Sequence, residues 1–109
     1  MLILNEQQLD DRVYNKIEVA YSIIGKKWMC LIINSLMDVP KRFSEINSII
    51  PELSKRMLTE RLKELEDYDI ILRNVITDRP LRSEYSLTNK GEDLGVALQT
   101  VESWAKKWL

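Results

Sequence analysis

Apolar residues recur every three or four positions over much of the chain, the spacing that places them on one face of a helix. The segment "NKIEVAYSII" (15–24) has this spacing and is followed by Gly25, a residue common just after helices. The segment "KKWMCLIINSLM" (26–37) is apolar around most of its circumference and is followed by Asp-Val-Pro at 38–40. This pattern predicts two helices, the second of which lies at the centre of the fold.

Two further helical segments follow. "FSEINSII" (43–50) has Ser44 as its expected N-cap and stops before Pro51, whose ring does not fit a helix interior. The next helix begins after a second expected N-cap, Ser54, and runs to about Tyr68. A short turn therefore joins two helices.

The period then changes from helical to extended. "IILRNVIT" (70–77) is rich in β-branched residues and predicts a strand. "DRPLR" (78–82) is typical of a turn, and "SEYSLT" (83–88) predicts a short returning strand. The last helix is expected over 89–108, capped by Thr88.

The order of these elements predicts the fold class. A helix–turn–helix (43–67) followed at once by a two-stranded hairpin (70–88) is the winged helix-turn-helix arrangement. With 109 residues the chain is long enough for one domain. We therefore expect a single, mainly helical domain over residues 1–109 with a small β-hairpin as its wing.

The helix after Ser54 opens with two cations, although the positive end of the helix dipole favours Asp or Glu. In a helix-turn-helix this end enters the DNA major groove, where cations meet phosphates and guanine edges. At about 100° per residue, Leu58, Leu62 and Leu65 lie on the opposite, core-facing side. Arg61 lies near the edge of that core stripe. The groove-facing candidates are Lys55, Arg56, Thr59, Glu60 and Lys63.

Other candidates lie where the chain would cross the phosphate backbone or reach the minor groove. Alternatively, all are ordinary solvent-exposed residues that form pairs such as Arg56–Glu60. The full set of DNA-binding candidates is Lys41, Arg42, Ser44, Ser54, Lys55, Arg56, Thr59, Glu60, Lys63, Arg79 and Arg82.

Net charge is −1 and taken whole does not favour nucleic-acid binding. The distribution of charge along the chain does favour nucleic-acid binding. Residues 41–63 hold six cations and three anions, and residues 73–82 hold three cations and one anion. The remainder of the chain is therefore acidic. A positive zone on an acidic body suits one polyanion-binding face.

The composition offers little for catalysis. The sequence has no histidine, and its three glycines do not cluster into a phosphate-binding loop. We expect no enzyme activity, no cofactor and no metal. A single cysteine, Cys30, and the lack of a long apolar run favour a cytoplasmic protein without a membrane span. Cys30 is interpreted as a packing residue on an apolar helix, or as a reactive thiol if it is exposed.

Four blocks together resemble the HxlR family of bacterial winged-helix transcription regulators. They are "IIGKKW" (23–28), "KRFSEI" (41–46), "IPELSKRMLTERLKELE" (50–66) and "RSEYSLTNKG" (82–91). The resemblance implies a homodimer formed by the N- and C-terminal helices (15–24 and 89–108), bound to a pseudo-palindromic operator. Many family members sense electrophiles or oxidants through a cysteine near the first conserved helix. That position is Asn15 here, so redox sensing does not carry over.

The last helix favours dimerisation independently, because its apolar stripe is wide for a small domain to cover by itself. The alternative is packing within one chain. The expected interface residues are Tyr21, Leu94, Leu98, Val101, Trp104 and Trp108. A small aromatic inducer could bind at such an interface among Tyr14, Tyr21, Trp28 and Trp104, but core and interface packing is the favoured explanation of these residues.

The sequence therefore predicts a dimeric DNA-binding transcription regulator, interpreted as a repressor that occludes the promoter. It would place residues 54–63 in the major groove and the 78–83 tip on the adjacent backbone. The alternative is a winged-helix protein-interaction module that binds no DNA, which the net charge and Glu60 would favour.

Overall fold

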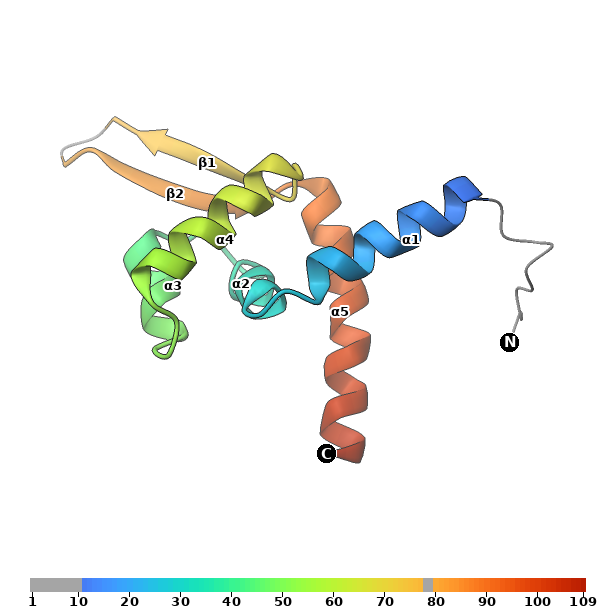
Figure 1. Cartoon of the computed structure of the whole chain (residues 1–109). Helices are drawn as coiled ribbons and strands as arrows, with labels where there is room; N and C mark the ends of the chain where they lie inside the picture. The colour runs from blue at the N-terminus through green and yellow to red at the C-terminus, as the bar shows by residue number, and fades with distance from the viewer. Residues whose placement is uncertain (1–10, 78–79) are drawn as a thin grey trace.

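The computed structural model describes residues 11–77 and 80–109, and its element order is that of a winged helix-turn-helix (Figure 1). The fold predicted from the sequence is confirmed. The elements are α1 (Asp11–Ile24), α2 (Met29–Ser35), α3 (Phe43–Ile49), α4 (Lys55–Asp67), β1 (Ile71–Ile76), β2 (Arg82–Leu87) and α5 (Asn89–Trp108).

The core lies where α2, α3, α4 and the start of β1 meet. Met29, Ile32 and Ile33 of α2 are fully buried, which confirms that this helix is central. The apolar stripe of α4 is buried against them. From α5, Leu98 closes the core on the far side. Burying each of these side chains contributes roughly 1.5–3 kcal/mol before the entropy cost of ordering the chain.

Helix α2 is shorter than the predicted 26–37 segment. Trp28 adopts the left-handed conformation, with φ 80° and ψ −16°, so the helix begins at Met29. Residues 25–28 instead form a turn in which the Met29 amide donates to the Lys26 carbonyl at 3.2 Å. A left-handed tryptophan costs about 1–3 kcal/mol and therefore has to be held by its surroundings.

The predicted N-caps of α4 and α5 are confirmed. The Ser54 hydroxyl accepts from the Met57 amide at 3.1 Å, and the Thr88 hydroxyl accepts from the Gly91 amide at 3.0 Å. Ser44 is not the N-cap of α3, so that prediction is wrong. Arg42 holds the cap position, and its amide donates to the Glu45 carboxylate at 2.9 Å.

The chain passes from α4 into β1 through a helix-terminating turn. Asp69 adopts a left-handed conformation, φ 60°, which aspartate tolerates better than most residues. The Asp69 amide donates to the Glu66 carbonyl, and the Ile70 amide donates back to the Leu65 carbonyl. This is the hydrogen-bond pattern of a Schellman motif, and it places the buried Ile70 at the entrance to the sheet.

The wing is an antiparallel hairpin in which β1 pairs with β2 from Ile71–Leu87 to Ile76–Arg82. A third strand is reduced to a single bridge, because Lys41 and Tyr85 exchange both backbone hydrogen bonds, at 3.0 and 2.8 Å. The bridge ties the loop before α3 to the base of the wing.

Helix α5 packs closely onto the base of the hairpin and onto the end of α2. A Cβ on Gly91 would lie 2.1 Å from the Ile70 carbonyl oxygen, and one on Gly95 would lie 2.1 Å from Met37 Sδ. Glycine is therefore required for the backbone approach at Gly91. By contrast, α1 extends away from the body (Figure 1), and the buried residue of this helix is Ile23.

Candidate nucleic-acid interface

The N-terminal half of α4 presents a polar face to solvent. Because Leu58, Leu62 and Leu65 are buried, the residues on the other side of the helix are turned outward. All five groove-facing candidates are exposed, namely Lys55, Arg56, Thr59, Glu60 and Lys63. The Thr59 hydroxyl donates to the Lys55 backbone carbonyl at 2.8 Å.

Arg56 is a cation of this face with 91% of its side chain exposed. Its Nε lies 3.6 Å from Glu60 Oε1, a pair open to water on both sides. Such exposed i,i+4 pairs contribute only about 0.3–0.5 kcal/mol, so Arg56 can exchange Glu60 for a phosphate at little cost.

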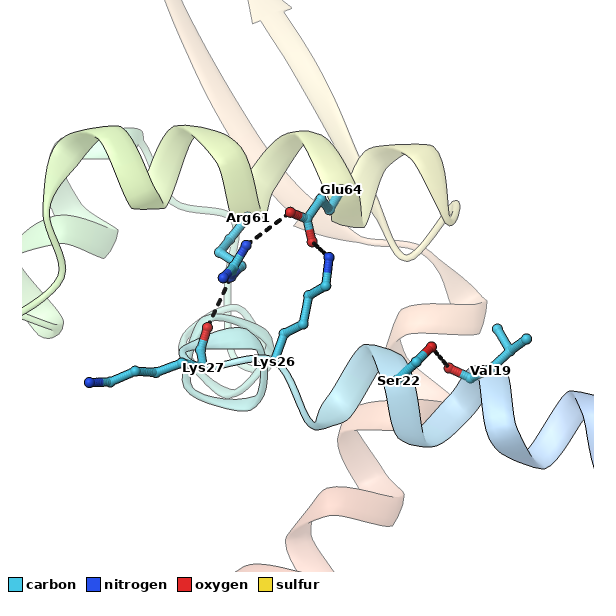
Figure 2. A network of polar contacts seen from close by, with 6 residues as sticks. All are labelled: Val19, Ser22, Lys26, Lys27, Arg61 and Glu64. Atoms are coloured by element: carbon cyan, nitrogen blue, oxygen red, sulfur yellow. Dashed lines mark hydrogen bonds and ion pairs between the residues drawn. The ribbon is translucent and has the colours of Figure 1, made fainter.

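Arg61 has a different position. Its side chain is 14% exposed and points inward, where Nε donates to the Lys27 carbonyl at 3.0 Å. One terminal nitrogen donates to Glu64 at 2.9 Å (Figure 2). Arg61 therefore belongs to the contacts that hold α4 in place and not to its outer face.

The candidates around the start of α3 also divide into exposed residues and one held by contacts within the chain. Arg42 and Ser44 are exposed at the start of the helix. Lys41 has its ammonium 2.5 Å from Asp38, and its side chain is 12% exposed. The hydrogen bond from Lys41 lowers the pKa of the Asp38 carboxyl. Lys41 is thus engaged within the chain through both its backbone and its side chain.

On the wing, Arg82 lies at the start of β2 and is half-buried, with Nε 3.6 Å from Glu84 Oε1. Arg79 lies outside the described residues. Arg73 was absent from the sequence-based candidates, yet it is exposed on β1 and its Nε donates to Ser83 at 3.2 Å. Its place in the positive 73–82 segment was the signal that could have selected it.

Similarity to known proteins identifies the family of this chain. A family model described as HxlR-like helix-turn-helix matches residues 23–109. The chain belongs to the HxlR-like family. The HTH-type transcriptional regulator YodB of Bacillus subtilis (strain 168) is 47% identical over 93 residues, which are 85% of this chain and 83% of YodB.

Solved structures of related regulators superpose on this HxlR-like fold. The reduced form of YodB matches with a TM-score of 0.78 at 43% identity, covering 92% of this chain and 94% of that one. A MarR-family regulator from Enterococcus faecalis V583 matches with a TM-score of 0.80 at 30% identity, covering 96% and 94%. The protein is therefore a DNA-binding transcriptional regulator of the helix-turn-helix type, and its relatives are regulators and not enzymes.

Apolar surface is concentrated on the two terminal helices of this HxlR-like chain. Trp104 and Trp108 on α5 and Tyr21 on α1 are more than half exposed, as is Val101. Leu94 packs against the core, and Leu98 is 7% exposed and belongs to the core itself. Leu98 was expected at a dimer interface, but the structure places it in the core of its own chain.

A surface hollow of about 270 Å³ lies beside α2 and the end of α3. Of the four aromatic residues expected around an inducer, it includes Trp28. Tyr14, Tyr21 and Trp104 do not line this hollow. Its walls are Trp28, Leu31, Asn34, Ser35, Ile49, Ile50, Pro51 and Glu52.

Cys30 is half-buried, and its thiol donates to the Ile24 carbonyl at 3.4 Å. Burial raises the pKa of this thiol, and the Glu102 carboxylate adds to the shift. A raised pKa keeps the thiol protonated and unreactive at neutral pH, which supports the packing interpretation. Within the described parts of the chain, no helix has the length and apolarity to cross a membrane.

Proposed function

We propose that this regulator is a homodimeric, cytoplasmic repressor that binds a pseudo-palindromic operator. The observation that carries the proposal is the exposed cationic start of α4 on a chain whose α1 and α5 also expose large apolar side chains. The first surface suits a polyanion, and the second suits a copy of the same chain.

DNA contact is assigned first to Lys55, Arg56 and Lys63, supported by the exposure of their side chains. Phosphate contacts of these cations supply affinity, while Thr59 and Glu60 lie where base edges can be read. The wing contributes Arg73 and Arg82 on the adjacent backbone. The remaining candidates are Arg42, Ser44 and Ser54 near the helix starts, Lys41 with its paired ammonium, and Arg79.

Dimerisation is assigned to Tyr21, Val101, Trp104 and Trp108. Exposed tryptophans on one helix are unfavourable in water and are favoured at the centres of protein interfaces. A two-fold axis relating two chains would place their α4 helices about 34 Å apart, one turn of DNA. Leu94, also expected at the interface, packs against the core of its own chain.

Repression would follow from occupancy, because a dimer seated in adjacent major grooves excludes polymerase from the promoter. An inducer, if one exists, has to change the distance or angle between the two α4 helices. Of the relatives, YodB has been solved in a quinone-bound form. This chain has Asn15 where the family resemblance expects the sensing cysteine, so we propose that any signal it receives is not read by a thiol there.

The test is fluorescence anisotropy of the purified chain with labelled duplexes from upstream regions, at several salt concentrations. We expect site-selective binding whose affinity falls steeply with salt, and loss of that binding in a Lys55→Ala/Arg56→Ala variant. A Lys27→Ala/Lys90→Ala variant, which removes the same charge from exposed positions outside the DNA-facing and dimer surfaces, is the matched control. Failure of every duplex to bind at low salt would favour the protein-interaction module instead.

A further inference from the structure

A network of polar contacts joins α4 to the turn between α1 and α2 (Figure 2). Lys26 Nζ lies 2.8 Å from one Glu64 oxygen, and Arg61 donates to the other at 2.9 Å. Arg61 also donates to the Lys27 carbonyl. The Glu64 carboxylate is therefore held between two cations, one from the turn and one from its own helix. We call Lys26, Arg61 and Glu64 the clamp.

The clamp acts on a segment that needs support. Residues 25–28 carry the left-handed Trp28, and Arg61 holds the carbonyl of the residue immediately before it. Helix α1 ends at this turn and extends from it away from the body (Figure 1), and its buried residue is Ile23. The direction of α1 relative to α4 therefore depends on the turn and on the clamp that fixes it.

The clamp is sheltered on its Arg61 side, whereas the Lys26 side chain is 49% exposed. The side chains of Arg61 and Glu64 are 14% and 26% exposed, so water screens this pair less than the open Arg56–Glu60 pair nearer the start of the same helix. Arg61 uses two donors of its rigid planar group at once, on Glu64 and on the Lys27 carbonyl, which fixes an orientation as well as a distance.

We propose that Glu64 is a positioning residue that sets the angle between α4 and α1, and through it the half-site spacing that the dimer accepts. This inference rests on the proposed function, because α1 has to lie at the dimer interface for its angle to reach the second α4. The carboxylate of Glu64 pairs with Lys26 and Arg61, and Glu64 contacts no base in this assignment.

The experiment measures spacing preference. A duplex selected by the wild-type protein from a randomised pool is remade with its half-sites one base pair closer or farther apart. Each step moves a half-site by about 3.4 Å and about 35° around the helix axis. We expect the wild-type protein to prefer its own spacing by about tenfold or more, and Glu64→Gln to reduce that preference to about threefold or less. Glu64→Gln keeps the shape of the side chain but leaves Lys26 and Arg61 without their shared anion.

Glu66→Gln is the matched control, because it makes the same change two residues along α4 and away from the clamp. Arg61→Lys is a second test variant that keeps the charge but loses the planar double donation, and it is expected to flatten the preference as Glu64→Gln does. Circular dichroism and thermal melting confirm that each variant is folded.

An unchanged spacing profile in folded Glu64→Gln, even with a lower melting temperature, would overturn the clamp proposal and leave the DNA-binding function standing. Absence of selection by the wild-type protein would instead overturn the proposed function, and the role of the clamp with it.

Discussion

Arg56 and Arg61 lie five residues apart on one helix. Substitution of Arg56 is predicted to weaken DNA binding with little effect on stability, whereas substitution of Arg61 is predicted to lower stability. Arg56→Ala removes an exposed side chain, so the free energy of unfolding is expected to change by less than about 0.5 kcal/mol. The affinity for DNA should fall about tenfold, and the slope of log affinity against log salt should decrease by about one. Anisotropy titrations and urea unfolding measure the two quantities.

Arg61→Ala removes two inward hydrogen bonds, one of them to a carboxylate. We expect it to lower the free energy of unfolding by about 1–3 kcal/mol. Equal effects of the two substitutions on stability would contradict this assignment of one arginine to the outside and one to the inside.

Glu64 should also make the stability depend on pH. Hydrogen bonding to Lys26 lowers the pKa of this carboxyl in the folded chain, and the Arg61 guanidinium acts in the same direction. A lowered pKa means that the unfolded chain binds the proton more readily, so the stabilisation is fully present above the unfolded value of about 4.3. It is lost as the pH falls through the folded value.

Urea unfolding between pH 7 and pH 3 measures this dependence. The wild-type protein is expected to lose stability more steeply on acidification than Glu64→Gln, which has no proton to gain at this position. Glu66→Gln should follow the wild-type curve. Parallel curves for the wild-type protein and Glu64→Gln would show that the ion pairs of the clamp contribute nothing measurable.

At the scale of elements, the two glycines of α5 are expected to differ in their tolerance of alanine. In Gly91→Ala the new methyl group meets a backbone carbonyl oxygen, which cannot move without shifting the entrance of β1. In Gly95→Ala it meets the Met37 side chain, which can rotate, and alanine gains about 1 kcal/mol of helix propensity. Thermal or urea unfolding should show a loss of about 2 kcal/mol or more for Gly91→Ala and a smaller loss for Gly95→Ala.

Thr88 connects three elements and should be sensitive to loss of its hydroxyl. Its oxygen accepts from the Gly91 amide, and the hydroxyl donates to the Asp69 carbonyl at 2.7 Å. Thr88→Val keeps the shape and is expected to cost about 1–2 kcal/mol of unfolding free energy. Thr88→Ser keeps the hydroxyl and should retain most of the stability. A neutral Thr88→Val would mean that water replaces both bonds.

The elements themselves were predictable because they follow from local patterns. The periodicity of Leu58, Leu62 and Leu65 and the caps Ser54 and Thr88 all involve residues within a few positions of each other. The start of α2 was not predictable. Residues 26–28 follow the helical pattern in the sequence, but in the structure Trp28 is left-handed and the helix begins after it. Ser44 is a good N-cap residue, but the N-cap of α3 is Arg42, two residues earlier in the chain.

Contacts between distant segments lie beyond such patterns. Lys26 and Glu64 are 38 residues apart, and nothing in either neighbourhood marks them as partners. The same holds for the Lys41–Tyr85 bridge that completes the wing. For the candidate site, the sequence identified the exposed face of α4 from its periodicity. It could not separate Lys41, whose ammonium is already paired, from Arg42, which is exposed.

At the scale of the whole molecule, the distribution of charge matters more than its sum. The cations of α4 and the wing lie on segments with a positive balance, and the rest of the chain is acidic. An acidic body repels DNA wherever the positive face is turned away, which favours one orientation of approach. The net charge of −1 is therefore compatible with DNA binding.

The molecule is elongated, so the exposure of its two terminal helices depends on the oligomeric state. The chain extends over 57 Å along its longest axis and 23 Å along its shortest, with α1 reaching away from the body. Trp108 is 65% exposed and Trp104 nearly as much, although aromatic side chains of this size are normally covered. The described residues of one chain leave large side chains of both terminal helices exposed, and we propose that a two-fold copy packs α1 and α5 against their equivalents.

Sedimentation equilibrium tests this directly. The wild-type protein is expected to sediment as a dimer, and Trp104→Arg should raise the dissociation constant about tenfold or more, because it places a charge at the centre of the apolar surface. Val39→Arg makes the same kind of change at an exposed apolar residue between α2 and α3 and should leave the dimer intact. Because half-sites are held together only by the dimer, Trp104→Arg should also lose tight operator binding while keeping its folded spectrum. A wild-type monomer at micromolar concentration would remove the basis for reading two half-sites at once.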